Sequence, residues 1–136
     1  MDFIKVLVAF LAAQGVLSPE VSSDGDGITY LQQLPDAPVE ANCVTCYDTD
    51  LPRVVSKQSG VYHIQVIMRR KKHSDVLTEI TQLFQFLCAR PEPVEDIGDG
   101  YFAIFDVRKG PISLGRDDNN NWRYSLNFPV TSLIYK

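Results

Sequence analysis

The chain has 136 residues, of which 45% are hydrophobic and 22% are charged, and its formal net charge is -4. This balance is that of a globular protein and excludes a disordered chain, which would combine low hydrophobicity with a high net charge. The length suits one domain over residues 1–136, and the longest apolar run falls short of the roughly 18 residues of a membrane span. An acidic chain is also poorly suited to binding nucleic acid as its main task.

The first segment predicts a helix that begins near Asp2 and stops at Gly15. Its apolar residues follow the spacing of one helical face: Phe3, Ile4, Leu7, Val8 and Leu11. Val6 and Phe10 lie off that face. A short helix that is apolar nearly all round needs cover on more than one side, from its own sheet or from a neighbouring subunit.

Three strands are expected in the middle of the chain, at residues 28–31, 41–47 and 61–68. The third strand alternates most clearly, and its apolar face carries Tyr62, Ile64, Val66 and Met68. Such alternation is typical of a half-buried strand in an antiparallel sheet.

A second helix is expected to begin around residues 73–75, with Ser74 as its N-cap, and to end before Pro91. Its apolar stripe comprises Val76, Ile80, Leu83, Phe84 and Leu87. We expect Phe84 and Leu87 to pack against the apolar face of the strand at 61–68. Truncating Phe84 to alanine should then cost about 3–5 kcal/mol, as a large-to-small change in a core does.

The last third is expected to be β, after an acidic loop at residues 92–100. Strands are expected at 101–107, 112–114 and 122–130, with an asparagine-rich loop before the last of them. The order of elements is therefore α-β-β-β-α-β-β-β. The fold class this predicts is α+β, with an antiparallel sheet of about five or six strands and two helices packed on one face.

The chain offers few groups for catalysis or metal binding. Cys43 and Cys46 form a CxxC motif, but in a strand their side chains point to opposite faces, so we expect neither a metal nor a disulfide there. His63 and His73 are the only imidazoles, and both positions are more often structural. Motifs for a nucleophilic serine, a zinc protease or a phosphate-binding loop are absent from the sequence. We therefore predict a protein that is not an enzyme and has no cofactor.

Charge is unevenly distributed along the chain. Residues 1–52 carry eight acids and one base, whereas residues 53–90 carry seven bases and two acids. The densest basic run is Arg69, Arg70, Lys71 and Lys72. It is interpreted as solvated surface, as a docking patch for an acidic neighbour, or as a contact for DNA phosphates. The acids proposed as its partners in assembly are Asp24, Asp26, Asp48 and Asp50.

Several stretches together carry a resemblance to a known family. After the apolar N-terminal helix, residues 60–70 form a strand that runs into the second helix at Ser74. Residues 107–117 precede the asparagine loop, and Tyr124-Ser-Leu-Asn-Phe128 follows it. In these features the chain resembles, over nearly its whole length, the minor capsid or tail terminator proteins of long-tailed bacteriophages.

The resemblance implies a homo-oligomer, a hexameric ring, that works in the virion tail after assembly in the host cytoplasm. The ring would cap the tail tube, stop its polymerisation and offer a docking surface to a head-side neck protein. DNA would pass through the bore without specific binding, and no membrane is involved. The resemblance transfers no catalytic residue, so the interface residues rest on the charge pattern alone.

Other functions stay open at this point. The chain could be a head–tail adaptor, a tail tube subunit or a cytosolic peptide-binding module that uses a sheet edge. A tube subunit should polymerise into long tubes, a terminator should close into rings and a binding module should stay monomeric.

Overall fold

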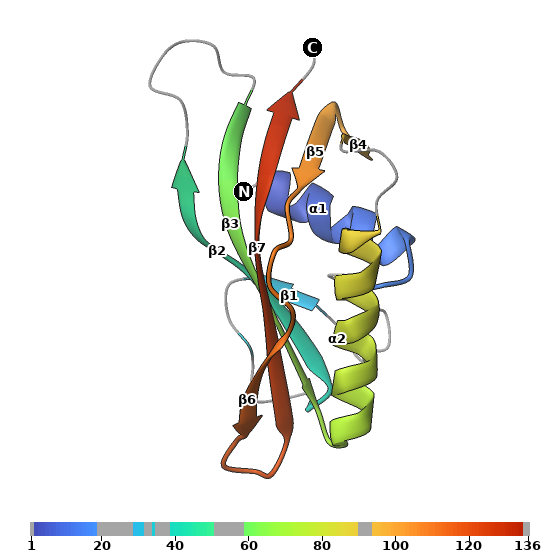
Figure 1. Ribbon diagram of the computed structural model, residues 1–136, viewed down its shortest axis with the longest axis vertical. Helices are drawn as coiled ribbons and strands as arrows, with labels where there is room; N and C mark the ends of the chain where they lie inside the picture. Colours follow the sequence, from blue (N-terminus) through green and yellow to red (C-terminus); the bar gives the residue numbers. More distant parts are fainter. Residues whose placement is uncertain are drawn as a thin grey trace.

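The structure, a computed structural model, describes residues 2–18, 29–31, 34, 39–50, 59–89 and 94–134. Two helices and seven strands follow one another along the chain (Figure 1): α1 (Asp2–Ala13), β1 (Thr29–Leu31), β2 (Ala41–Asp50), β3 (Ser59–Arg70), α2 (His73–Cys88), β4 (Glu95–Gly98), β5 (Tyr101–Phe105), β6 (Ile112–Arg116) and β7 (Trp122–Ile134). The predicted α+β class and the predicted order of elements are confirmed, with one further short strand, β4.

The strands form one sheet in the order β1-β2-β3-β7-β5-β4. Strand β6 lies off this path and pairs with β7. Both helices lie on the same side of this sheet in Figure 1, as predicted. The expectation of a wholly antiparallel sheet is wrong at one edge, because β1 pairs with β2 in parallel.

The expectation of a plain loop at residues 92–100 is also wrong. Residues 95–98 form β4, which pairs with β5 in a hairpin. Its turn uses left-handed backbone at Gly98, Asp99 and Gly100, with φ of 105°, 52° and 80°. Glycine and aspartate are the residues that adopt this conformation most readily, so the same composition that suggested a loop builds a tight hairpin turn.

The long central pair β3 and β7 determines which residues face the helices. β3 has 12 residues and β7 has 13, and they pair from Ser59↔Leu133 to Arg70↔Trp122. Ile64 pairs with Phe128 and Val66 with Leu126, so these side chains share one face. All four are at most 1% exposed. Each such side chain stabilises the fold by about 1.5–3 kcal/mol through burial.

Helix α1 covers the upper part of that face as its periodicity predicted. The five residues assigned to its apolar face are all buried, and Phe3 stacks on Tyr62 with ring centroids 4.4 Å apart. Phe10, off the face, packs against Phe86 and Phe105. The cover on its second side is therefore supplied by the same chain. Gly15, with φ of 77°, ends the helix, as expected.

Helix α2 buries Val76, Ile80, Leu83 and Leu87, but leaves Phe84 half-buried with its ring against Gly110. We therefore expect the Phe84→Ala change to cost less than a fully buried phenylalanine would. The assignment of Ser74 as N-cap is wrong. The helix begins two residues earlier than that cap implies, with Lys72 at the cap position and without a side-chain cap hydrogen bond.

Candidate assembly surface on the open face of the sheet

The basic run falls at the end of β3, where it divides into a buried half and an exposed half. Arg69 and Arg70 are the last residues of the strand and are 6% and 5% exposed. Lys71 and Lys72 follow the strand and are exposed. The charge available to a neighbour in this run therefore comes mainly from the two lysines.

Arg70 joins three elements on the helix-covered side of the sheet. Its Nε donates to a carboxylate oxygen of Glu79 on α2 at 2.6 Å. One Nη donates to the backbone carbonyl of Ala41 on β2 at 3.1 Å and to that of Arg69 at 2.8 Å. A buried charge held by this many acceptors is a structural group, because losing any of them would leave it poorly compensated.

Arg69 lies on the opposite side of β3 and also donates to a backbone carbonyl near the start of β2. Its Nε donates to the backbone carbonyl of Val39 at 2.8 Å, and the backbone N–H of Lys71 donates to Glu40 at 3.2 Å. The end of β3 is thus fastened to residues 39–41, at the start of β2, by side chains from both faces. Burial of the arginines follows from this fastening.

The proposed acidic partners are placed only in part. Asp24 and Asp26 lie outside the described residues. Asp48 and Asp50 lie in β2 beyond a bulge at Cys46/Asp48, and their side chains are not among those described. Asp50 pairs with Val61, while Ala41 pairs with Arg69. At about 3.3 Å per residue, the acidic end and the basic end of the β2–β3 pair are therefore roughly 30 Å apart, too far to neutralise each other.

The face of the sheet turned away from both helices carries a different set of residues. Residues that alternate with the core positions project there, including Ile67 on β3 and Arg123 on β7. β6 adds two apolar side chains, Ile112 and Leu114, which are 49% and 38% exposed. We call this side the open face. Its mixture of half-buried apolar and polar groups is typical of a surface that contacts another protein.

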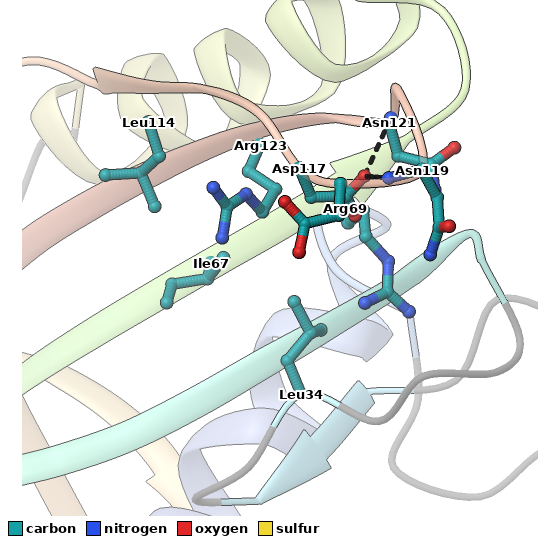
Figure 2. A pocket seen from close by; sticks show the side chains of 9 residues that line it. Leu34, Ile67, Arg69, Leu114, Asp117, Asn119, Asn121 and Arg123 are labelled. Atoms are coloured by element: carbon teal, nitrogen blue, oxygen red, sulfur yellow. Dashed lines mark hydrogen bonds between the residues drawn. The ribbon is translucent and has the colours of Figure 1, made fainter.

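At one end of the open face the sheet and the β6–β7 turn enclose a hollow of about 350 Å³ (Figure 2). Its apolar wall is formed by Leu34, Ile67 and Leu114, and its polar wall includes Arg69, Arg123 and Asp117. The side chains in Figure 2 come from β3, from β6 and β7, and from the turn that joins β6 to β7, together with Leu34 from the segment after β1. The hollow therefore depends on the same hairpin that makes the open face apolar.

Two groups in this hollow differ in how they are satisfied. Asp117 accepts the backbone N–H groups of Asn119 and Asn121 at 2.9 Å each, which holds the turn. These hydrogen bonds, chiefly those from Asn121, lower the pKa of the Asp117 carboxyl, with a smaller contribution from the positive charge of Arg69. The Nε of Arg123, by contrast, is buried and has no hydrogen-bond partner. A buried unpaired donor typically costs about 1–3 kcal/mol.

The thiols and imidazoles do not gather into a site. Cys43 and Cys46 lie on opposite faces of β2, because Cys43 pairs with Ile67 and Cys46 with Ile64, and none of the three cysteines, all of which the structure describes, forms a disulfide. Burial raises the pKa of the Cys43 thiol. Among the described residues there is no group of three or more His, Cys, Asp or Glu side chains that could hold a metal ion.

The histidines contact aromatic side chains. His73 shares a 2.8 Å hydrogen bond with the hydroxyl of Tyr124 and packs its ring against Trp122. His63 lies beside the ring of Tyr47, with ring centroids 5.9 Å apart. Within the described part of the chain, no helix is both long and apolar enough to cross a membrane.

Sequence reasoning identified the basic run but missed the hollow. Arg123 and Leu114 lie within the strands expected at residues 122–130 and 112–114, and the sequence pattern gives neither of them a role. The one signal available was an arginine inside a strand whose other outward residues are serine, asparagine and proline. Its neighbours Leu34 and Ile67 come from distant parts of the sequence, so pattern alone could not assemble the group.

The sequence model of the bacteriophage tail terminator protein family matches residues 10–134. The chain therefore belongs to this family, and it is a structural protein of the phage tail. A search among curated proteins gives no significant match.

Proposed function

We propose that the protein closes into a ring, hexameric in the simplest case, that caps the tail tube and stops its polymerisation. The same ring would offer a docking surface to the head-side neck protein. Family membership over residues 10–134 supports the terminator role. In this proposal residues 1–136 act as a single tail-terminator-like domain, which assembles in the host cytoplasm and stays in the virion.

The separation of charge along the β2–β3 pair is the observation that carries the ring. Lys71 and Lys72 are exposed at one end, and the acidic end of β2, with Asp48 and Asp50, lies at the other. Opposite charges at opposite ends of one subunit favour head-to-tail contacts, which repeat around a ring. The acids at Asp24 and Asp26 are proposed to join the same contact, in the next subunit or in a neck protein.

Arg69 and Arg70 enter this proposal as supports. They fasten the strand that ends in the two lysines, so they hold the lysines in position. The net charge of -4 also suits a conduit, since like charge lets DNA slide through a bore without specific binding.

The terminator role is tested by measuring tail length in electron micrographs of phage that lack the protein. We expect overlong tubes without joined heads, and tails of uniform length with heads once the protein is supplied. Tails of normal length in its absence would overturn the role. Long tubes made by the purified protein alone would instead support the tube subunit alternative.

The lysine contact is tested with Lys71→Glu/Lys72→Glu and with Lys109→Glu as a control of the same chemistry at another exposed position. We expect the double change to reduce ring numbers, most clearly at low salt, because exposed pairs are screened. Reversing the two lysines, and leaving Arg69 and Arg70 in place, keeps the test separate from unfolding. Ring numbers equal to those of the control would show that the lysines are solvated surface.

A further inference from the structure

The hollow of the open face contains a donor that the subunit itself does not use. Arg123 Nε is buried and unpartnered, while Arg69 Nε already donates to Val39. In Figure 2 the guanidinium of Arg123 lies between Leu114 and Ile67, within the hollow. A planar guanidinium is suited to a carboxylate, which can accept from two of its N–H groups at once.

The residues that line the hollow indicate which class of ligand fits it. Leu34, Ile67 and Leu114 form an apolar surface that would pack against the carbon stem of an acidic side chain. A volume of about 350 Å³ accommodates one or two side chains. Asp117 and Asp118 also line the hollow and offset the charges of Arg69 and Arg123, so the hollow has no excess of positive charge for a series of phosphates and suits a single carboxylate placed beside Arg123.

We propose that this hollow receives an acidic side chain from residues 1–52 of a second copy of the chain. That segment supplies the carboxylates, with eight acids and one base. The proposal rests on the proposed ring. In such a ring one subunit presents the acid and its neighbour presents the hollow, so the contact is heterologous and repeats at every junction.

The main test replaces Leu114 with glutamate. Leu114 is 38% exposed, so the subunit should tolerate the change, while the new carboxylate would occupy the place of the incoming acid. Leu77→Glu is the matched control, since Leu77 is 41% exposed and lies on α2, away from the hollow. We expect the dissociation constant of the ring, measured by light scattering over a dilution series, to rise about tenfold or more in L114E and to stay unchanged in L77E.

A second variant removes the donor. Arg123→Gln should weaken the ring without lowering the melting temperature of the dissociated subunit, because Arg123 Nε makes no hydrogen bond within the subunit. A lower melting temperature with unaltered rings would mean that Arg123 serves the fold alone, and would overturn the proposal. Rings equally stable in L114E and wild type would also overturn it, yet would leave the ring and the terminator role intact.

The occupant is identified with a photoreactive amino acid at position 114 in rings of the purified protein. We expect a cross-link to a peptide from residues 1–52 of another copy. A cross-link within one chain or to another segment would overturn the proposal. So would a cross-link that forms only when tail tube protein is added.

Discussion

The two faces of the sheet differ in how deeply their side chains are buried. On the helix-covered face β3 presents Ile64, Val66 and Met68, none more than 1% exposed. On the open face the same strand presents Val61 and Ile67, which are only half-buried. Strand pairing is identical for both sets, so the difference comes from what lies above each face.

This contrast separates what the fold needs from what it leaves available. The covered face contains the apolar core and the Arg70 network, which together specify the positions of the two helices. The open face contributes less burial and retains an unpaired arginine and two exposed apolar residues of β6. A tail protein has to be stable alone and still have surface for its neighbours, and here the two demands fall on opposite sides of one sheet.

The difference between the two faces is tested most strongly by truncating the same residue type on each face of β3. Ile64→Ala should lower the free energy of unfolding by about 3–4 kcal/mol, since it leaves a cavity in a dry core. Ile67→Ala should lower it by about 1–2 kcal/mol, because Ile67 is half-buried. Urea denaturation of the dissociated subunit measures both. Equal losses would mean that the open face is as important to folding as the covered one.

The next largest effect concerns the two halves of the basic run. Arg70→Ala should cost about 2–3 kcal/mol, because it removes charge-assisted hydrogen bonds to α2 and β2. The figure stays below that of a fully buried pair, since Glu79 is 46% exposed and can be solvated. Lys71→Ala should change stability by about 0.5 kcal/mol or less. If Arg70→Ala proved as mild as Lys71→Ala in the same urea assay, the support assigned to Arg70 would be wrong.

The cysteines of β2 reverse the comparison locally, because Cys43 lies on the open face yet is buried, whereas Cys46 lies on the covered face and is half-buried. A thiol-reactive probe should label exposed Cys88 first, half-buried Cys46 next and buried Cys43 last in the native protein. Burial raises the pKa of Cys43, so less of the reactive thiolate is present at neutral pH. Cys43→Ser should cost on the order of 1 kcal/mol. Labelling of Cys43 as rapid as that of Cys88 would show that the open face is less ordered around β2 than described.

The smallest effect is expected at the β6–β7 turn. The pKa of Asp117 is lowered by the backbone N–H groups of the turn, so its ionised form contributes stability above the usual value of 3.8. That contribution should be lost as the pH falls through the lowered pKa. The difference in melting temperature between wild type and Asp117→Asn should therefore be present at neutral pH and shrink as the pH is lowered below 3.8. A difference that persists in acid would indicate a role of Asp117 other than charge.

The sequence predicted the covered face well and the open face poorly. Periodicity sufficed for α1 and for the alternation of Trp122 to Val130, because it reports which side of an element is buried. It could not show that Arg69 and Arg70 turn inward, since their acceptors at Val39, Ala41 and Glu79 lie 9 to 30 residues away.

The elements that were missed had local causes. β4 was hidden in a segment rich in acid and glycine, whose left-handed turn gave a loop signal although it joins two strands. β6 extends past the expected end at Leu114 through a bulge, where Gly115 has φ of 75°. A bulge shifts the alternation by one residue, so pattern reading stops there.

The central claim is that the open face, and not the outer surface of α2, is covered when subunits assemble. Hydrogen–deuterium exchange of the assembled ring, compared with the dissociated subunit, tests this most directly. The account predicts slower exchange on assembly at the backbone amides of β6 and of the β6–β7 turn, and little change along α2. Slower exchange confined to α2, with β6 unaffected, would contradict it.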